Sequence, residues 1–211
     1  MTGAKKPKTR DAEATKSRIM SAARKEFAKR GLGGARVDEI AERAKANKRM
    51  IYHYFGSKEK LFQAVLEDAY LGIRTAEQKL DLDNIPAEEA LEKLVRFTWD
   101  YYLKHPEFIT LVNSENLHRA RHLKKSEVIK LASRRFVGMM DGLLKRGADE
   151  GVFRSGIDPT QLNITIAAIG YYYLTNRFTG AIVFERDMMT PDALEERLAF
   201  NIDTIMRLVK A

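Results

Sequence analysis

The chain has 211 residues, of which 45% are hydrophobic and 31% charged, and it carries a formal net charge of +8. This apolar content supports a buried core and excludes wholesale disorder, and the absence of cysteine excludes disulfides, thiolate nucleophiles and cysteine-based zinc sites. The N-terminus lacks the apolar segment of a signal peptide, and the most apolar stretch, residues 162–174, is too short to span a bilayer. We therefore expect a soluble, cytoplasmic protein without a membrane partner.

The positive charge is concentrated at one end of the chain. Residues 1–60 hold seventeen Lys and Arg against seven Asp and Glu, whereas residues 61–211 hold twenty against twenty-two. A uniformly basic protein would not divide in this way. The distribution indicates a basic module aimed at a polyanion.

Apolar residues at helical spacing and only five prolines predict an all-α protein of about nine helices. Residues 1–14 lack periodicity and are expected to form a flexible basic arm, whose cations attract phosphate or only confer solubility. Start and stop signals set the helix boundaries, with Asn47, Ser57, Asp158 and Thr190 as N-caps and Gly31 as a stop. The expected helices span residues 15–30, 37–44, 48–54, 58–80, 87–104, 107–113, 126–149, 159–184 and 191–210.

Residues 37–55 have the pattern of a helix-turn-helix, in which a second short helix enters the major groove of DNA. Ile51 and Phe55 lie four residues apart and are expected to face the core. The other side of this helix offers donors and rings suited to bases and phosphates. The side chains expected to point wholly or partly outward are Lys48, Arg49, Met50, Tyr52 and His53. For His53, packing at the domain boundary is the alternative.

The segment from Thr15 to about Val65 resembles the DNA-binding domain of the TetR (tetracycline repressor) family. The most specific part is the run Ile51-Tyr52-His53-Tyr54-Phe55-x-Ser57-Lys58-Glu59. The resemblance implies an N-terminal three-helix DNA-binding domain over residues 15–60. A larger helical domain over residues 61–211 would bind a ligand and dimerise.

The resemblance also implies roles for individual residues. Lys48, Arg49 and Tyr52 would approach bases or adjacent phosphates from the recognition helix. Tyr54 and Lys58 would bind phosphate, and Arg36 would meet the DNA backbone at the start of the preceding helix. This chain departs from the family at Lys45, where members usually have glycine at a turn position that favours positive φ.

The C-terminal helices carry aromatic, methionine and amide side chains, which are core residues by default but are also what a mostly apolar effector pocket uses. The residues that we expect to contact an unknown small-molecule effector are Trp99, Tyr102, Phe108, Asn113, Asn116, Phe136, Met140, Tyr172 and Asn176. The last two helices are apolar on more than one face. We therefore expect a homodimer formed through them as a four-helix bundle.

The leading hypothesis is a bacterial, nucleoid-associated repressor that binds double-stranded operator DNA, with no cofactor, no metal and no catalytic residues. An enzyme with an appended DNA-binding domain is one alternative, because Glu115, His118 and His122 have helical spacing that suits metal ligands. The cations in the same segment would repel a metal ion, so we expect a surface or hinge segment there, with an electropositive patch for an anionic effector as the other alternative. A ligand-independent architectural DNA binder is the third hypothesis.

Overall fold

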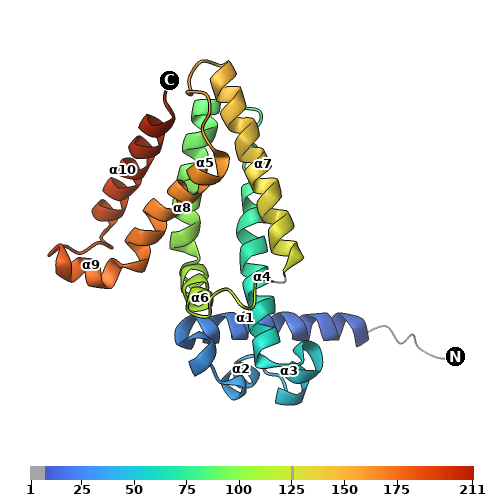
Figure 1. Cartoon of the computed structure of the whole chain (residues 1–211). Coiled ribbons are helices and arrows are strands. Elements are labelled where there is room, and N and C mark those ends of the chain that lie inside the picture. The colour runs from blue at the N-terminus through green and yellow to red at the C-terminus, as the bar shows by residue number, and fades with distance from the viewer. Residues whose placement is uncertain (1–7, 125) are drawn as a thin grey trace. The chain divides into compact units, whose positions relative to one another are not determined.

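The computed structural model describes residues 8–124 and 126–211, and within them it contains ten α-helices (Figure 1). Gly31 has non-helical angles and interrupts the first helix near its end, where a stop is expected from the sequence. The only strand-like feature in the described part is an isolated antiparallel bridge between Phe153 and Lys210. The helices are α1 (Lys8–Gly34), α2 (Val37–Arg43), α3 (Lys48–Phe55), α4 (Lys58–Glu77), α5 (Ala87–Lys104), α6 (Pro106–Leu117), α7 (Glu127–Asp149), α8 (Pro159–Thr175), α9 (Arg177–Val183) and α10 (Pro191–Val209).

The expected caps form as hydrogen bonds. Asn47 accepts from the N–H of Arg49 at 2.9 Å, and Asp158 accepts from the N–H of Gln161 at 2.8 Å. The Ser57 hydroxyl accepts from Lys60 N–H, and that of Thr190 accepts from Ala193 N–H. These contacts are local in sequence, which is why the sequence predicts them.

Several helix boundaries differ from expectation, including the end of α6, which lies at Leu117 and not at residue 113. The expected arm is partly wrong, because α1 already begins at Lys8, and only residues 1–7 of the arm lie outside the described residues. The expected helix 159–184 is broken into α8 and α9 at Asn176. There the Asn176 side chain donates to the carbonyl of Tyr172 at 2.9 Å, so an amide competes with the backbone and ends the helix.

The chain divides into two compact units, each described separately. One comprises the chain through Tyr70 together with Thr110–Ser126, and the other comprises Leu71–Ile109 and Glu127–Ala211. The first unit therefore runs ten residues beyond the boundary expected at residue 60. It also takes in a later segment of the chain.

In the first unit, α1 packs against α2 and α3. Its core is built from fully buried side chains, with Ile19 and Phe27 from α1, Ile40 from α2 and Ile51 from α3. Phe27 meets Phe62 of α4 edge to face, with ring centroids 5.1 Å apart. This arrangement makes the pair more favourable than burial of the two rings alone.

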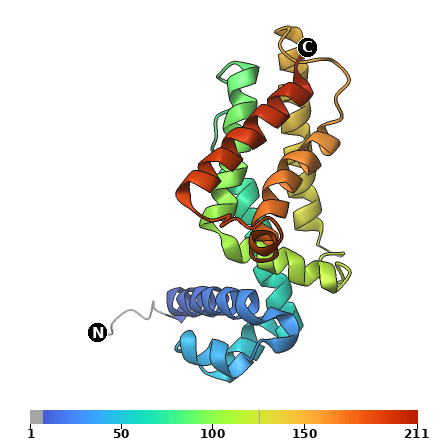
Figure 2. The ribbon, with the colours of Figure 1, turned by 90° about the vertical axis from the view of Figure 1, so that its left-hand side faces the viewer.

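In the second unit, α5 is the central helix and packs against α7, α8 and α10 (Figures 1 and 2). Its buried face, including Leu91 and Leu94, meets Met140 of α7 and Ile205 of α10 in one apolar cluster. No helix in the described residues combines the length and apolar composition needed to cross a bilayer.

The turn between α2 and α3 is a Schellman motif. The N–H of Ala46 donates to the carbonyl of Ala41 at 3.0 Å, and that of Lys45 donates to Glu42 at 3.0 Å. The motif requires a left-handed residue after the last helical turn, and Lys45 occupies that position with φ 49°. The departure noted in the sequence is thus a lysine in a conformation that favours glycine.

Replacing Lys45 with glycine should raise the free energy of unfolding by about 1 kcal/mol, because the left-handed conformation costs a residue with a Cβ about this much. Urea unfolding followed by circular dichroism measures the difference. Lys45→Ala is the matched control, since it removes the cationic side chain but keeps the Cβ. An equal gain in both variants would show that the charge, not the backbone conformation, is unfavourable.

A carboxylate is buried near the end of α4. The Glu77 side chain is 3% exposed and pairs with Arg74 at 3.1 Å, while the Arg74 guanidinium lies over the Phe136 ring, 4.1 Å from its centroid. Burial raises the pKa of Glu77 to about 7, although the charge of Arg74 acts in the opposite direction. The folded state therefore holds the proton of Glu77 more tightly than the unfolded chain does.

This difference penalises folding once the unfolded carboxyl is ionised. The penalty is absent below the unfolded pKa of 4.5, grows between 4.5 and about 7, and is constant at higher pH. Relative to wild type, Glu77→Gln should therefore gain on the order of 3 kcal/mol of stability as pH rises through that window. Denaturant unfolding at several pH values measures this, with Glu88→Gln, at an exposed position of α5, as control. A difference in the free energy of unfolding between Glu77→Gln and wild type that does not vary with pH would contradict the prediction.

Candidate nucleic-acid interface

The second helix of the helix-turn-helix, α3, presents one face outward. Its Asn47 cap fixes the first turn, and Ile51 and Phe55 are buried as the spacing predicts. Lys48, Arg49, Tyr52 and His53 are exposed, and Met50 is half-buried. The described residues provide no ion-pair partner for the Arg49 guanidinium, so its donors remain available to a ligand such as a base edge.

Lys48, unlike Arg49, has an acidic partner. Its ammonium contacts a carboxylate oxygen of Asp38, on α2, at 2.8 Å. The hydrogen bond between them lowers the pKa of Asp38 and raises that of Lys48. Both side chains are exposed, so the pair contributes little stability, but it joins the two helices of the motif and holds the lysine beside α2.

Two cations lie close to the start of α2. The Lys58 ammonium, from the first turn of α4, donates to the backbone carbonyl of Ala35 at 3.1 Å. Arg36, the next residue, is the N-cap of α2 and has an exposed side chain that lies 3.9 Å from Glu39. Lysine and arginine next to a helix N-terminus form an arrangement that suits a phosphate.

The rings of α3 form a row at its end. The His53 and Tyr54 centroids are 5.4 Å apart and those of Tyr54 and Phe55 are 6.4 Å apart. His53 is exposed, which fits phosphate contact better than burial at a domain boundary, and Tyr54 is half-buried. The part each takes in DNA binding remains a prediction.

A residue that the sequence analysis missed positions the motif. Glu26 of α1 is 1% exposed, and its carboxylate accepts from the N–H of Arg36 at 3.3 Å. The same carboxylate pairs with Arg30 at 3.3 Å and approaches Arg43 to 3.8 Å. It therefore ties α1 to both ends of α2. The signal was available, because an acid within the buried stripe of residues 19, 23 and 27 needs a partner.

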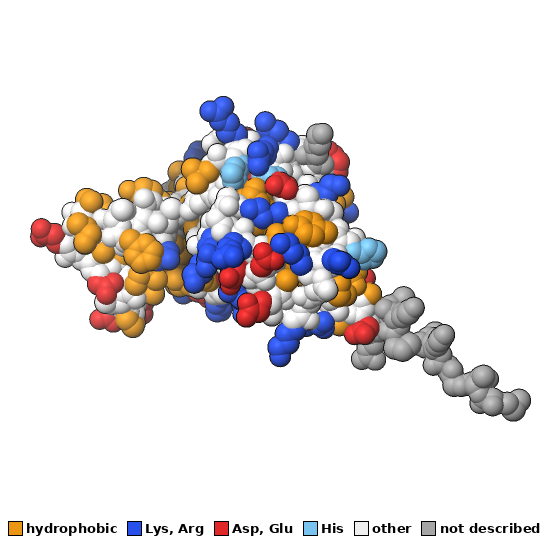
Figure 3. All heavy atoms as spheres, turned by 90° about the horizontal axis from the view of Figure 1, so that it is seen from below, with side chains coloured by type: hydrophobic (Ala, Val, Ile, Leu, Met, Phe, Trp, Pro, Cys, Tyr) orange, Lys and Arg blue, Asp and Glu red, His pale blue; other side chains and the backbone are white. Residues whose placement is uncertain are grey.

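The surface of this region is mixed in charge. Figure 3, viewed from the α2 and α3 end of Figure 1, shows many Lys and Arg side chains with Asp and Glu between them. Some of these acids are paired within the first unit, as Asp38 is with Lys48. Attraction to a polyanion therefore depends on the cations that lack an acidic partner, such as Arg49.

The residues expected to bind an effector are divided between the two units. Asn113 and Asn116 belong to the first unit and the other seven to the second. Five side chains are buried in the second unit as core: Trp99, Tyr102, Phe108, Phe136 and Met140. Asn116 donates to the carbonyl of Val112, and Asn176 ends α8. Tyr172 lines a hollow of the second unit, where it is joined by residues that were not anticipated.

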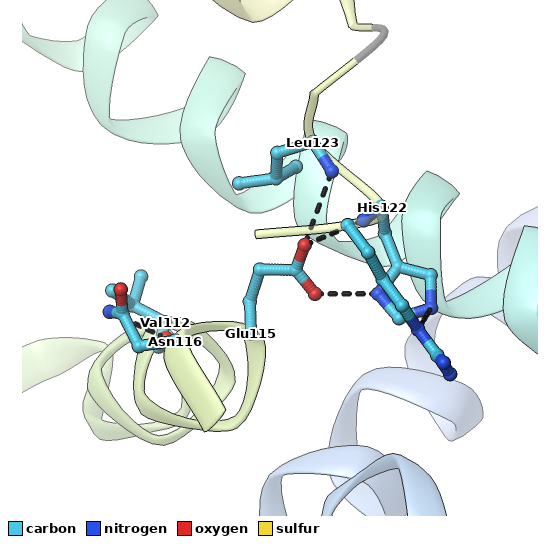
Figure 4. Close-up of polar contacts among 6 residues, drawn as sticks. Val112, Glu115, Asn116, His122 and Leu123 are labelled. Carbon is cyan, nitrogen blue, oxygen red and sulfur yellow. Dashed lines mark hydrogen bonds and ion pairs between the residues drawn. The ribbon is translucent and has the colours of Figure 1, made fainter. Parts of the chain in front are cut away.

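Glu115 and His122, considered as metal ligands, bond to each other (Figure 4). One oxygen of the buried Glu115 carboxylate lies 2.6 Å from His122 Nδ1, and the other accepts the N–H groups of His122 and Leu123 at 2.8 and 3.2 Å. The His122 ring packs on Phe62, with centroids 5.2 Å apart. This cluster anchors residues 117–124 within the first unit. The described residues hold no group of three His, Asp or Glu side chains that suits a metal ion.

Comparison with known proteins assigns both the N-terminal and the C-terminal parts of the chain to a family. A model of the bacterial regulatory proteins of the tetR family matches residues 19–65, and a model of the tetracyclin repressor-like C-terminal domain matches residues 87–205. The HTH-type transcriptional repressor NicS of Pseudomonas putida is 41% identical over 95% of this chain and 94% of its own length. The HTH-type transcriptional repressor SCO4008 of Streptomyces coelicolor is 44% identical over 51% of this chain and 53% of its own.

Solved structures agree with this assignment. The crystal structure of the transcriptional regulator SCO4942 from Streptomyces coelicolor aligns with a TM-score of 0.70 and 25% identity, covering 92% of this chain and 98% of that one. A tetR-family regulatory protein from Rhodococcus RHA1 aligns with a TM-score of 0.72 at 19% identity, over 94% and 97% of the two chains, and so supports the fold alone. The chain belongs to the TetR family of bacterial transcriptional regulators, and its named relatives are repressors rather than enzymes.

Proposed function

We propose that this protein is a repressor that binds a pseudo-palindromic operator as a homodimer and is released when a small molecule binds its C-terminal domain. Because operator DNA lies in the bacterial cytoplasm, the protein acts there. The observation that carries the proposal is the exposed face of α3, where Arg49 has no acidic partner among the residues that the structure describes, while Ile51 and Phe55 hold the helix in place.

The side chains around α3 divide by the part of DNA that they suit. Arg49 lies in the first turn of the recognition helix, which is the part of a helix-turn-helix that contacts base edges. Lys58 and Arg36 lie by the start of α2, where a phosphate would meet two cations and a helix N-terminus. Base contacts would supply sequence preference, and phosphate contacts would supply affinity and register.

Dimerisation is supported by apolar side chains that the single chain leaves exposed. On α8, Ile166 and Leu174 are buried while Ile164 and Tyr172 lie on the opposite, exposed side. On α10, Phe200 is exposed while Ile205 is buried. A large exposed apolar surface is typical of an interaction site. In a two-fold dimer, these faces would set the two α3 helices about one DNA turn, roughly 34 Å, apart.

Substitutions at α3 and α4 should affect DNA binding in different ways. Arg49→Ala should weaken binding to the operator by about 1–3 kcal/mol and relax preference at the contacted base pair. Lys58→Ala should weaken binding to all sequences alike and reduce the slope of log affinity against log salt by about 1. Mobility shift with the upstream intergenic DNA, at several salt concentrations and with non-specific competitor, measures both effects.

Lys130→Ala, an exposed lysine of α7, controls for loss of one positive charge. Circular dichroism checks that each variant is folded, because Lys58 also bonds to a backbone carbonyl. A salt slope unchanged in Lys58→Ala would remove Lys58 from the phosphate site. Complexes of wild type that all disappear in the presence of competitor would favour an architectural DNA binder.

A charge on the proposed dimer face should separate the subunits. Ile164 is 52% exposed in the single chain, so Ile164→Glu should leave the fold intact but place an unpaired carboxylate inside the interface. Light scattering should give the mass of one chain at concentrations where wild type is dimeric. Val128→Glu is the matched control, since Val128 of α7 is 51% exposed and lies off this face. If Ile164→Glu stays dimeric, the interface lies elsewhere.

A further inference from the structure

A hollow of about 290 Å³ lies between α8, the segment after α9 and α10 of the second unit. We call it the Arg197 hollow. Its wall consists of Tyr172, Tyr173, Phe184, Arg186, Met188 and Arg197. A smaller hollow of about 150 Å³ adjoins it and shares Tyr173, Arg186 and Arg197. The volume is at the lower end of that of ligand pockets, which favours an occupant of about one ring.

The two arginines of the hollow differ in how their charge is balanced. Arg186 pairs with the Glu196 carboxylate. Arg197 donates to the carbonyl of Ile169 at 3.1 Å, but it has no acidic partner among the described residues. Its Nε is buried and makes no hydrogen bond. Burial lowers the pKa of Arg197, which is the direction expected for a cation that no anion compensates.

Aromatic rings surround this unbalanced cation. The Arg197 guanidinium carbon lies 5.3 Å from the centroids of both the Tyr173 and the Phe200 rings. Tyr173 is held in place because its hydroxyl donates to the carbonyl of Met188 at 2.8 Å. Such contacts attract the cation but do not neutralise it, and a half-buried charge favours an anionic partner.

We propose that the Arg197 hollow is the effector site and that it binds a small planar aromatic carboxylate. The guanidinium offers a fork of donors that matches the two oxygens of a carboxylate, and the tyrosine, phenylalanine and methionine side chains suit the attached ring. The proposal rests on the function proposed above, because it names the class of molecule that would release the repressor.

The position of the hollow suggests how binding is sensed. Tyr172 and Phe184 on its rim are each 62% exposed, and Tyr172 lies on the α8 face assigned to the dimer. In the dimer a second copy would lie next to the mouth of the hollow. An occupant would therefore contact the surface that sets the spacing of the two recognition helices.

Benzoate is the probe that tests this site. Trp99 is the sole tryptophan, and its ring lies 5.7 Å from that of Tyr173 in the wall, so its fluorescence reports on the hollow. Equilibrium dialysis of labelled benzoate against the full-length protein gives stoichiometry directly. We expect saturable binding of one benzoate per chain at up to millimolar concentration, a matching change in Trp99 fluorescence, and much weaker binding of benzamide and of acetate.

Variants then test whether Arg197 makes the contact. Arg197→Met should weaken benzoate binding about 30-fold or more. The affinity of Arg197→Lys for benzoate should lie between those of wild type and Arg197→Met, because lysine keeps the charge but lacks the forked donors of the guanidinium. Arg207→Met is the matched control on α10, since Arg207 pairs with Asp203 and does not line the hollow. Circular dichroism and light scattering check that the variants fold and dimerise as wild type does.

Absence of saturable binding to wild type, or equal binding by wild type and Arg197→Met, would overturn the proposal. Dissociation of the dimer by Arg197→Met, with no benzoate binding to wild type, would assign Arg197 to a carboxylate of the second copy and would also overturn it. These assays contain no DNA, so their failure leaves the repressor proposal intact. Failure of the wild-type protein to bind operator DNA when no benzoate is present would instead contradict the proposal that it is a repressor.

Discussion

A carboxylate buried inside a basic unit must be neutralised where it lies, and the way Glu26 is neutralised fixes the helix-turn-helix. Its partners are Arg30 on its own helix, Arg43 at the end of α2, and the N–H of Arg36 at the start of α2. Two of these contacts reach opposite ends of α2, so a shift of α2 along α1 would break one or both and leave the buried carboxylate with Arg30 alone, which is costly. The orientation of α3 follows, because the Schellman turn and the Lys48–Asp38 pair join it to α2.

The parts of the fold that are local in sequence are the parts that the sequence predicts. The caps at Asn47, Ser57, Asp158 and Thr190 each use a partner two or three residues away, so residue type and position suffice. The break at Asn176 was missed because neither glycine nor proline marks it, and a side-chain amide alone turns the chain. The early start of α1 was missed because residues 8–14 are polar and show no apolar periodicity, although they are helical in the structure.

In the candidate site, too, the features set by local sequence were predictable and those set by tertiary contacts were not. Exposure of Arg49 and burial of Ile51 and Phe55 follow from the 3.6-residue period, which sequence reasoning can apply. The pairing of Lys48 with Asp38 and the anchoring of Lys58 on Ala35 depend on tertiary contacts across 10 and 23 residues, which composition does not specify. For the effector pocket, aromatic residues at helical spacing drew attention to Trp99 and Tyr102, which are core. Arg197, which lines the proposed site, was not anticipated because an arginine on a surface helix looks solvated until its neighbours in space are known.

A ligand site beside a dimer face would be coupled to operator binding by thermodynamic linkage, as any effector site must be. In the proposed repressor, an anion in the Arg197 hollow can shift the dimer only by the difference between its affinities for the DNA-compatible and the incompatible arrangement. By linkage, operator DNA must weaken binding of that anion by the same factor. A half-buried guanidinium that has no acidic partner among the described residues is well suited to generate such a difference. Small movements of the facing subunit would change how much solvent and how many donors surround the charge, and electrostatic interactions at partly buried sites are sensitive to both.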